Sequence, residues 1–290
     1  MTEQTETNSK KRGRGKSQKT IGLIETMRQI VEDTHPITGR GVGYKLFSRQ
    51  LIKSMSTQEM QRVYRMLKEA REEGIIPWEW IVDETRDLER ISSWSGPAGF
   101  ARDAVDSYRR NCWDDQAVRV EVWSEKGTVR GVLKPILDEY GVGFRVMHGF
   151  SGATSVHDIA TDGDGRDLIA LYAGDYDPSG LYMSECDLPN RLEKYEGDHV
   201  TLKRVALKQE QLGGLISFKA SDKDKDPRYK WFTASHGHEC WELDALDPNT
   251  LRTIVEDEIV DLIDPMEWSR SKMMEAAEHE SLKAALQYCR

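Results

Sequence analysis

Between residues 118 and 207, apolar strand patterns alternate with helical patterns, and this alternation constrains the fold more than any other feature. The strand patterns are 118–123, 143–147, 168–174 and 200–207, and the helical patterns between them are 126–140, 155–160 and 181–195. Such alternation predicts a parallel sheet whose helices are the crossover connections. We therefore expect an α/β domain, a Rossmann-like parallel sheet, over residues 116–262.

The segment before it, residues 19–95, is predicted to be a separate DNA-binding domain. Helical patterns at 20–34, 44–52 and 58–73 precede an extended pattern at 75–86, and the segment 35–43 is turn-rich. Three helices followed by an extended wing are typical of a winged helix-turn-helix, which places a later helix in the major groove. Arg62, Arg65 and Lys68 would then contact DNA. A plain helical subdomain with a charged solvent face is the alternative.

The remaining segments are predicted to be a tail, a connector and a terminal helix. Residues 1–18 are basic and low in apolar content, which predicts disorder, either as a solubilising tail or as a DNA-contacting arm. Residues 96–115 are a charged connector. Residues 263–290 are expected to form one amphipathic helix that packs on the core or on a partner.

Composition favours a protein of the cytoplasm. We find no apolar run long enough to span a bilayer and no signal-peptide pattern, and the four cysteines form no CxxC pair. The net charge of −9 opposes DNA binding, but the acidic excess is concentrated between 239 and 280, and basic residues are concentrated between 40 and 71.

Acidic residues follow two of the predicted strands directly. Glu125 comes after the first strand, and Asp175 and Asp177 come after the third. Ligands of open α/β sheets bind at the carboxyl ends of the strands, and Mg²⁺ prefers oxygen ligands that include few carboxylates. These three carboxylates are therefore a candidate metal site. Loop carboxylates after strands are common, so a solvated loop is the alternative.

At these residues the chain resembles the toprim domain of topoisomerases, primases and some nucleases. The segments EVWSEKGTVRGVL, GFSGATS, GDYDPSG and WELDAL are similar to the A subunit of type IIB DNA topoisomerases, the superfamily of topoisomerase VI and the meiotic double-strand-break protein, and to short mobile-element relatives. The resemblance covers residues 20 to 262. It implies a winged helix ahead of the toprim domain, Mg²⁺ (with Mn²⁺ as an alternative), duplex DNA as substrate and a homodimer. A mobile-element or viral protein would act in the host cytoplasm.

The same family cleaves DNA with the second tyrosine of an Arg-x-x-Tyr-Tyr motif. Here Arg40 and Tyr44 hold the spacing, and Gly43 stands in place of the first tyrosine. The resemblance implies that Tyr44 forms a phosphotyrosyl bond to a DNA 5′ end, working with the metal site of the other protomer. Tyr44 as a core aromatic is the alternative.

Other residues are assigned weaker roles. Lys126 could neutralise a phosphate, or it could be a solvated charge. His236 and His238 alternate with Cys240 in SHGHEC, which predicts a strand near the site rather than a zinc centre, because structural zinc usually has four ligands. The sequence has no P-loop pattern, so ATP would act only through a separate GHKL-type ATPase B subunit. A toprim nuclease without a covalent intermediate and a non-catalytic DNA-binding protein remain alternative functions.

Overall fold

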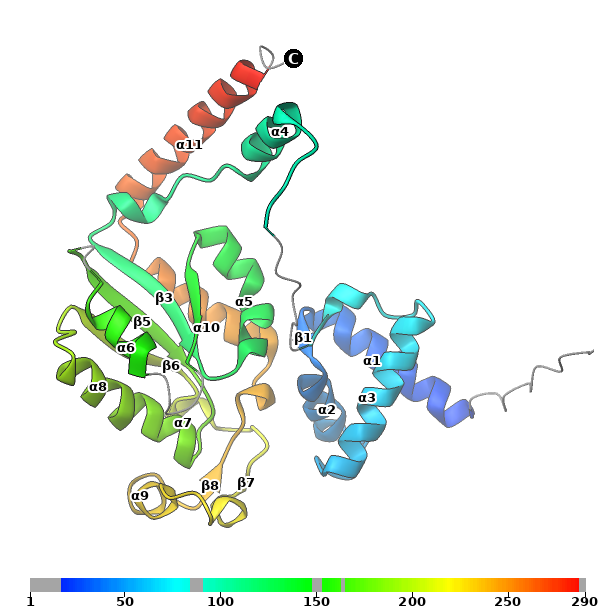
Figure 1. The fold of residues 1–290 in the computed structure, drawn as a ribbon. Helices are drawn as coiled ribbons and strands as arrows, with labels where there is room; N and C mark the ends of the chain where they lie inside the picture. The colour runs from blue at the N-terminus through cyan, green and yellow to red at the C-terminus, as the bar shows by residue number, and fades with distance from the viewer. Residues whose placement is uncertain (1–16, 84–90, 148–152, 163–164, 287–290) are drawn as a thin grey trace, which may run out of the picture.

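The computed structural model describes residues 17–83, 91–147, 153–162 and 165–286. Its N-terminal part is a helical unit with its own apolar core (Figure 1). The helices are α1 (Gln18–Thr34), α2 (Gly39–Ser48) and α3 (Thr57–Glu72). Met27, Ile30 and Leu46 are fully buried between them. The tail prediction for residues 1–18 lies almost wholly outside the described residues.

Helix α2 begins at Gly39 rather than at residue 44, so it includes residues 39–43 of the segment expected to be turn-rich, and it ends at Ser48 rather than at residue 52. Thr38 caps it by accepting a hydrogen bond from the backbone nitrogen of Gly41 at 2.9 Å. Close packing explains a glycine inside the helix: a Cβ on Gly43 would lie 2.5 Å from the sulfur of Met60. The cost of glycine in a helix is thus offset by the close approach of α2 to α3.

The predicted wing is mostly wrong within the described residues. Trp78–Trp80 forms one turn of 3-10 helix, and only Ile81–Val82 (β2) is extended. This strand pairs in parallel with β1 (Ile37–Thr38). The ring of Trp80 stacks on His35 at 4.6 Å, and Arg71 covers the ring of Trp78 at 4.3 Å.

The α/β prediction is confirmed by a four-stranded sheet that is parallel throughout, in the order β4-β3-β5-β6. The strands are β3 (Val118–Ser124), β4 (Gly143–Val146), β5 (Asp167–Ala173) and β6 (Val200–Ala206). In the register, Trp123 of β3 lies beside Tyr172 of β5. The carboxyl ends of these two strands therefore meet at one edge.

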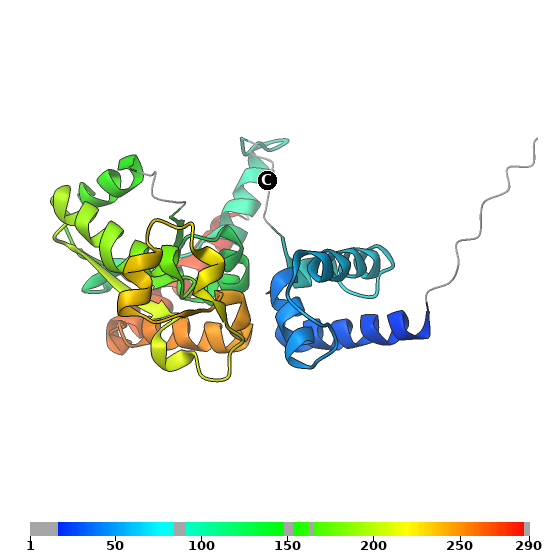
Figure 2. The same ribbon diagram turned by 90° about the horizontal axis from the view of Figure 1, so that it is seen from below.

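Helices cover both faces of the sheet (Figures 1 and 2). On one face α5 (Gly127–Tyr140) and α10 (Pro248–Val260) pack on β3, β5 and β6. On the other face lie α6 (Ala153–Ala160), a π turn (Met183–Asp187) and α8 (Leu188–Lys194). The π turn and α8 continue one helical run that starts with α7 (Pro178–Tyr182). This run begins three residues before the predicted start, because Asp177 caps it and Pro178 occupies the first position.

The chain after the sheet forms short elements and then two helices. The short elements are Gln209–Gln211, β7 (Phe218–Lys219), Ala220–Lys223, α9 (Tyr229–Ser235), β8 (Glu239–Cys240) and Leu243–Ala245, with β7 and β8 antiparallel. Helix α10 was not predicted, although its signals were visible: Asp247 caps the backbone nitrogens of Asn249 and Thr250, and Pro248 follows it.

Helix α11 (Pro265–Leu286) matches the predicted terminal helix, and α4 (Pro97–Ser107) lies in the predicted connector, which also contains the 3-10 turn Cys112–Asp115. Helix α11 was expected to be amphipathic, but it has no buried apolar face: among its described residues, Ser271 alone is buried. In the described ranges we find no helix with the length and apolar content needed to cross a membrane.

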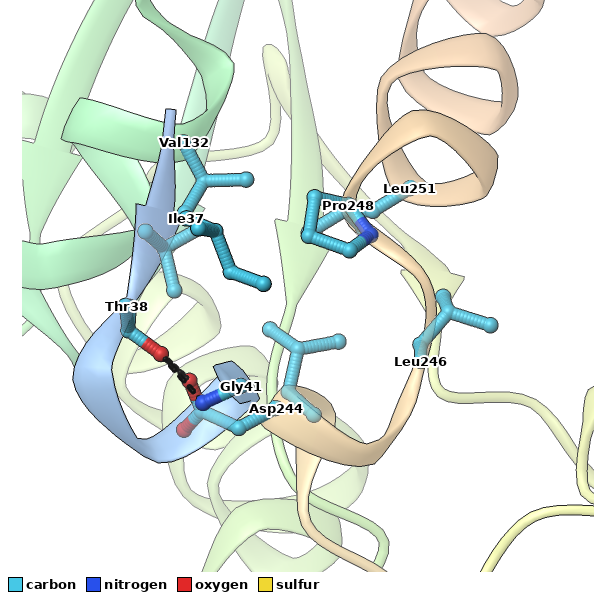
Figure 3. Close-up of a pocket in the computed structure, with 10 residues that line it drawn as sticks. Ile37, Thr38, Gly41, Val132, Asp244, Leu246, Pro248 and Leu251 are labelled. Carbon is cyan, nitrogen blue, oxygen red and sulfur yellow. Dashed lines mark hydrogen bonds between the residues drawn. The ribbon is translucent and has the colours of Figure 1, made fainter. Parts of the chain in front are cut away.

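The helical unit is joined to the sheet domain by Arg252, a buried residue of α10. Its guanidinium donates to the backbone oxygens of Thr34 at 3.1 Å, Pro36 at 3.2 Å and Val132 at 3.0 Å. Beside it, apolar side chains of β1, α5 and α10 line a narrow pocket in which Thr38 donates to Asp244 (Figure 3). This junction places α2 next to the carboxyl edge of the sheet.

Candidate functional site

The three predicted carboxylates lie at the carboxyl edge of the sheet. Glu125 directly follows β3, and Asp175 and Asp177 follow the neighbouring strand β5. Burial raises the pKa of Glu125, and the negative charges of Asp175 and Asp177 raise it further. The structure therefore brings these side chains within electrostatic range of one another, as the strand order predicts.

Asp175 and Asp177 are buried, and each carboxylate already has hydrogen-bond partners. Asp175 accepts hydrogen bonds from the backbone nitrogen of Leu243 and from the Lys126 ammonium, both at 2.8 Å. Asp177 accepts from the backbone nitrogen of Gly180 at 2.7 Å and forms an ion pair with Lys223. Two lysines thus neutralise two buried carboxylates.

The donor set fits a hard cation such as Mg²⁺, because it consists of carboxylate oxygens beside an open polar cleft. In the side-chain arrangement described, however, no group of three or more His, Cys, Asp or Glu residues is positioned to hold a metal ion. Each lysine ammonium contacts one oxygen of its aspartate, Lys126 at Asp175 and Lys223 at Asp177. These two oxygens would become available to a cation only if the lysines moved away.

Lys126 also links the edge to the helical unit. Its ammonium lies 3.4 Å from Asp244, and Asp244 accepts a hydrogen bond from Thr38 at 2.5 Å. Burial disfavours the charged ammonium, but the charges of Asp175 and Asp244 outweigh it and raise the pKa of Lys126. Lys126 therefore stays protonated at neutral pH, as a phosphate-neutralising role requires.

A cleft of about 630 Å³ opens between the helical unit and this edge. One wall comes from β1, α2 and α3, and the other from the first turn of α5. The lining residues are Thr38, Gly39, Arg40, Tyr64, Val82, Asp83, Glu125, Lys126, Gly127, Thr128 and Asp244. Glu125 and Lys126 are thus accessible from the side on which α3 lies.

Arg204 of β6 holds the loop that carries Asp175 and Asp177, and sequence reasoning missed it. Its guanidinium donates to the backbone oxygens of Gly174 at 2.9 Å, Asp175 at 2.5 Å, Gly180 at 3.0 Å and Leu207 at 2.8 Å. It also donates to the hydroxyl of Ser184 at 2.6 Å. Burial lowers the pKa of Arg204, but an arginine remains protonated. A positive charge therefore lies directly behind the acidic loop. An arginine inside an apolar strand pattern was the available signal.

Lys223 and Asp244 were also missed. They lie far from β5 in the sequence and reach the site only through the folding of the segment after β6. Glu242, which lies 202 positions from Arg40 in the sequence, is the ion-pair partner of Arg40.

Tyr44 and Arg40 lie on α2, but neither side chain is free. Tyr44 is 5% exposed, and burial together with the charge of Glu242 raises its pKa, against an opposing effect of Arg40. Arg40 lies 5.8 Å from the Tyr44 ring and forms a two-point ion pair with Glu242. A Cβ at Gly43 would lie 2.5 Å from the sulfur of Met60, so a second tyrosine beside Tyr44 would require the Met60 side chain to move.

The histidines do not converge as a strand would predict. His236 is the residue at which α9 ends, and only Glu239–Cys240 is extended. His236 lies 3.1 Å from Glu185, His238 is exposed and Cys240 is buried. The three side chains therefore do not share one face.

The candidate DNA contacts lie on the outer side of α3. Arg65 is exposed, Arg62 lies 3.7 Å from Glu59, and Lys68 lies 3.5 Å from Glu72. Exposed pairs of this kind are weak, so these cations remain accessible to phosphates.

Comparisons with models of protein families, with curated proteins and with solved structures find no match to this chain. The function is therefore argued from the site itself.

Proposed function

We propose that the protein is a Mg²⁺-dependent DNA-cleaving enzyme with a toprim domain, similar to the A subunit of type IIB topoisomerases. The observation that supports this most strongly is the approach of Glu125, Asp175 and Asp177 at the carboxyl edge of a parallel sheet. The cleft beside them faces the helical unit, which would serve as the winged-helix domain.

In this proposal Glu125, Asp175 and Asp177 would hold Mg²⁺ or Mn²⁺. The bound ion would stabilise negative charge on the phosphate during cleavage. Lys126 would leave Asp175 and pair with a phosphate oxygen, since it lines the cleft. Arg62, Arg65 and Lys68 would contact the DNA backbone.

The proposed nucleophile is the Tyr44 hydroxyl. Its oxygen would form a bond to phosphorus while the bond to the DNA 3′ oxygen breaks, and the phenolic proton would be transferred overall to that 3′ oxygen. The products are a 5′ phosphotyrosyl link and a free 3′ hydroxyl, and religation is the reverse. Arg40, once released from Glu242, would stabilise the developing charge.

A hydrolytic toprim nuclease is the second candidate, and the burial of Tyr44 favours it. A phenol that is 5% exposed, with a raised pKa and an arginine engaged elsewhere, is poorly placed to attack DNA. In this alternative, water would be the nucleophile and Tyr44 would be a core residue.

Further partners follow from the resemblance alone. The proposal includes a homodimer and a separate GHKL-type ATPase subunit, with action in the cytoplasm, either of the cell that encodes it or of the host of a mobile element or virus. Non-catalytic DNA binding is the third candidate, and the experiments must distinguish it from the tyrosine-dependent cleaving enzyme and from the hydrolytic nuclease.

A cleavage-trapping assay tests the chemistry. The protein is incubated with supercoiled plasmid and Mg²⁺ or Mn²⁺, quenched with SDS and analysed with and without protease. We expect cut DNA that enters the gel only after protease, its loss in Tyr44→Phe and its retention in the control Tyr195→Phe. Cut DNA that is indifferent to protease would establish the nuclease, and absence of cutting, alone and with an ATPase partner, would favour a binding protein.

A binding measurement tests the metal site without relying on activity. We expect Mg²⁺ to raise the melting temperature of the wild-type protein and not that of Asp177→Asn. If the variant and the wild type respond equally, the carboxylates are not the metal ligands.

A further inference from the structure

Helix α11 extends away from the sheet, with α4 alongside it (Figure 1). Among the residues that the structure describes, those that contact α11 lie on one side of it. On that side Glu278 accepts from the hydroxyl of Tyr108 at 2.5 Å and from Arg110 at 2.9 Å. His279 lies 3.1 Å from the backbone oxygen of Val105, and Ser271 donates to Asp115. These contacts fix the orientation of the helix about its own axis.

The opposite side of α11 carries a seam of regular spacing. Its members recur at intervals of four and three residues and are all exposed: Met266, Arg270, Met273, Ala277, Glu280 and Ala284. At 3.6 residues per turn, all six lie within about 40° of one line along the helix. Intervals of four and three residues are the spacing of a coiled-coil contact seam.

The seam is complementary to itself when a second copy runs in the opposite direction. A two-fold axis at the level of Glu275 would place residue n of one helix opposite residue 550 − n of the other. Met266 then faces Ala284, Met273 faces Ala277, and Arg270 faces Glu280. Every large apolar side chain meets a small one, and every positive charge meets a negative one.

We propose that this seam binds a second copy of the chain as an antiparallel helix pair. An isologous contact needs one patch that matches itself under a two-fold axis, and the seam has this property in both size and charge. Both methionines are open to a partner, since Met266 is 81% exposed and Met273 is 69% exposed.

Existing contacts of the seam charges do not prevent the pairing. Arg270 lies 3.6 Å from Glu267, and Glu280 lies 2.9 Å from Lys283, both within α11 and on its surface. Such exposed pairs contribute little, so they can be exchanged for contacts across the interface. Because the seam spans only three heptads, we expect a dimer that dissociates at concentrations on the order of micromolar.

The inference gives an interface to the homodimer that the proposed function includes, but it does not depend on DNA cleavage, and its test needs no DNA. The full-length protein is studied by sedimentation equilibrium from about 1 to about 200 μM, a range that brackets the expected dissociation constant. We expect concentration-dependent dimerisation. Arg270→Glu places two like charges at each of two symmetry-related contacts, so it should weaken the dimer about tenfold.

The charge swap identifies the geometry. Glu280→Arg should weaken the dimer as Arg270→Glu does, and the double variant Arg270→Glu with Glu280→Arg should restore it. Lys134→Glu is the matched control, with the same charge change on the exposed surface of α5 and away from the seam, and it should leave the dimer unchanged. Circular dichroism verifies that each variant is folded. A monomer at every concentration, a dimer indifferent to Arg270→Glu or a double variant that stays dissociated would each overturn the proposal.

Discussion

Replacing Arg204 by methionine tests the view that this residue holds the acidic loop in place. Methionine keeps much of the length and apolar bulk of the side chain but cannot donate hydrogen bonds. Five acceptors lose their donor: four backbone oxygens and the hydroxyl of Ser184. All lie around the loop 174–180, which carries Asp175 and Asp177.

The expected loss can be estimated from these contacts. A hydrogen bond to a charged group contributes about 1.5–3 kcal/mol, and a buried acceptor left without a donor costs about 1–3 kcal/mol. The sum overestimates the effect, because the variant no longer buries a guanidinium and water can reach some of the oxygens. We expect Arg204→Met to lower the free energy of unfolding by about 3 kcal/mol. Arg204→Lys keeps the charge without the fork geometry and should lose about half of that.

Urea denaturation followed by circular dichroism measures the loss, and hydrogen exchange reports on the loop itself. Faster exchange in Arg204→Met is expected for two amides that are hydrogen-bonded in the wild-type protein. The amide of Gly174 donates to the backbone oxygen of Ala206, and the amide of Leu207 donates to that of Gly174. Arg191→Met is the matched control, because its ion pair with Asp187 lies within one helical turn and contributes about 0.5 kcal/mol. A loss in Arg204→Met below about 1 kcal/mol, or no greater than in the control, would refute the reasoning.

Two further predictions concern packing and pH. Gly131→Ala should lower the free energy of unfolding by about 1 kcal/mol, because the new Cβ would lie 2.4 Å from a methyl of Val82. Gly22→Ala meets no atom within 4 Å and should raise the free energy of unfolding by about 0.5–1 kcal/mol. Equal gains of the two variants in thermal melts would contradict this. Burial opposes the ionisation of Glu121, but the hydrogen bonds from Arg145 at 2.7 and 2.8 Å outweigh it and lower its pKa. The stabilisation is therefore present above the unfolded pKa of about 4.3 and is lost as pH falls through the lower folded value. Glu121→Gln should cost about 1 kcal/mol at pH 7 and progressively less as pH falls through that folded value. A loss that does not change with pH would sink this interpretation.

Local periodicity was enough to predict the parallel sheet and the position of its acidic edge. Strand and helix patterns depend on residues close in the sequence, and the order of parallel strands brings their carboxyl ends together. Glu125, Asp175 and Asp177 were predictable for that reason. The same patterns failed at 78–80 and at SHGHEC, where apolar alternation indicated strands and the chain forms a 3-10 turn and a helix end instead.

The sequence by itself determined the α/β class, the N-terminal helices and which strands end in carboxylates, because those properties follow from short-range spacing. Tertiary structure alone decided that Lys126 and Lys223 occupy the carboxylates, that Glu242 holds Arg40 and that Tyr44 is buried. The Arg40–Glu242 contact joins residues 202 positions apart. No local pattern encodes such a contact, since it exists only once the helical unit has packed on the edge of the sheet.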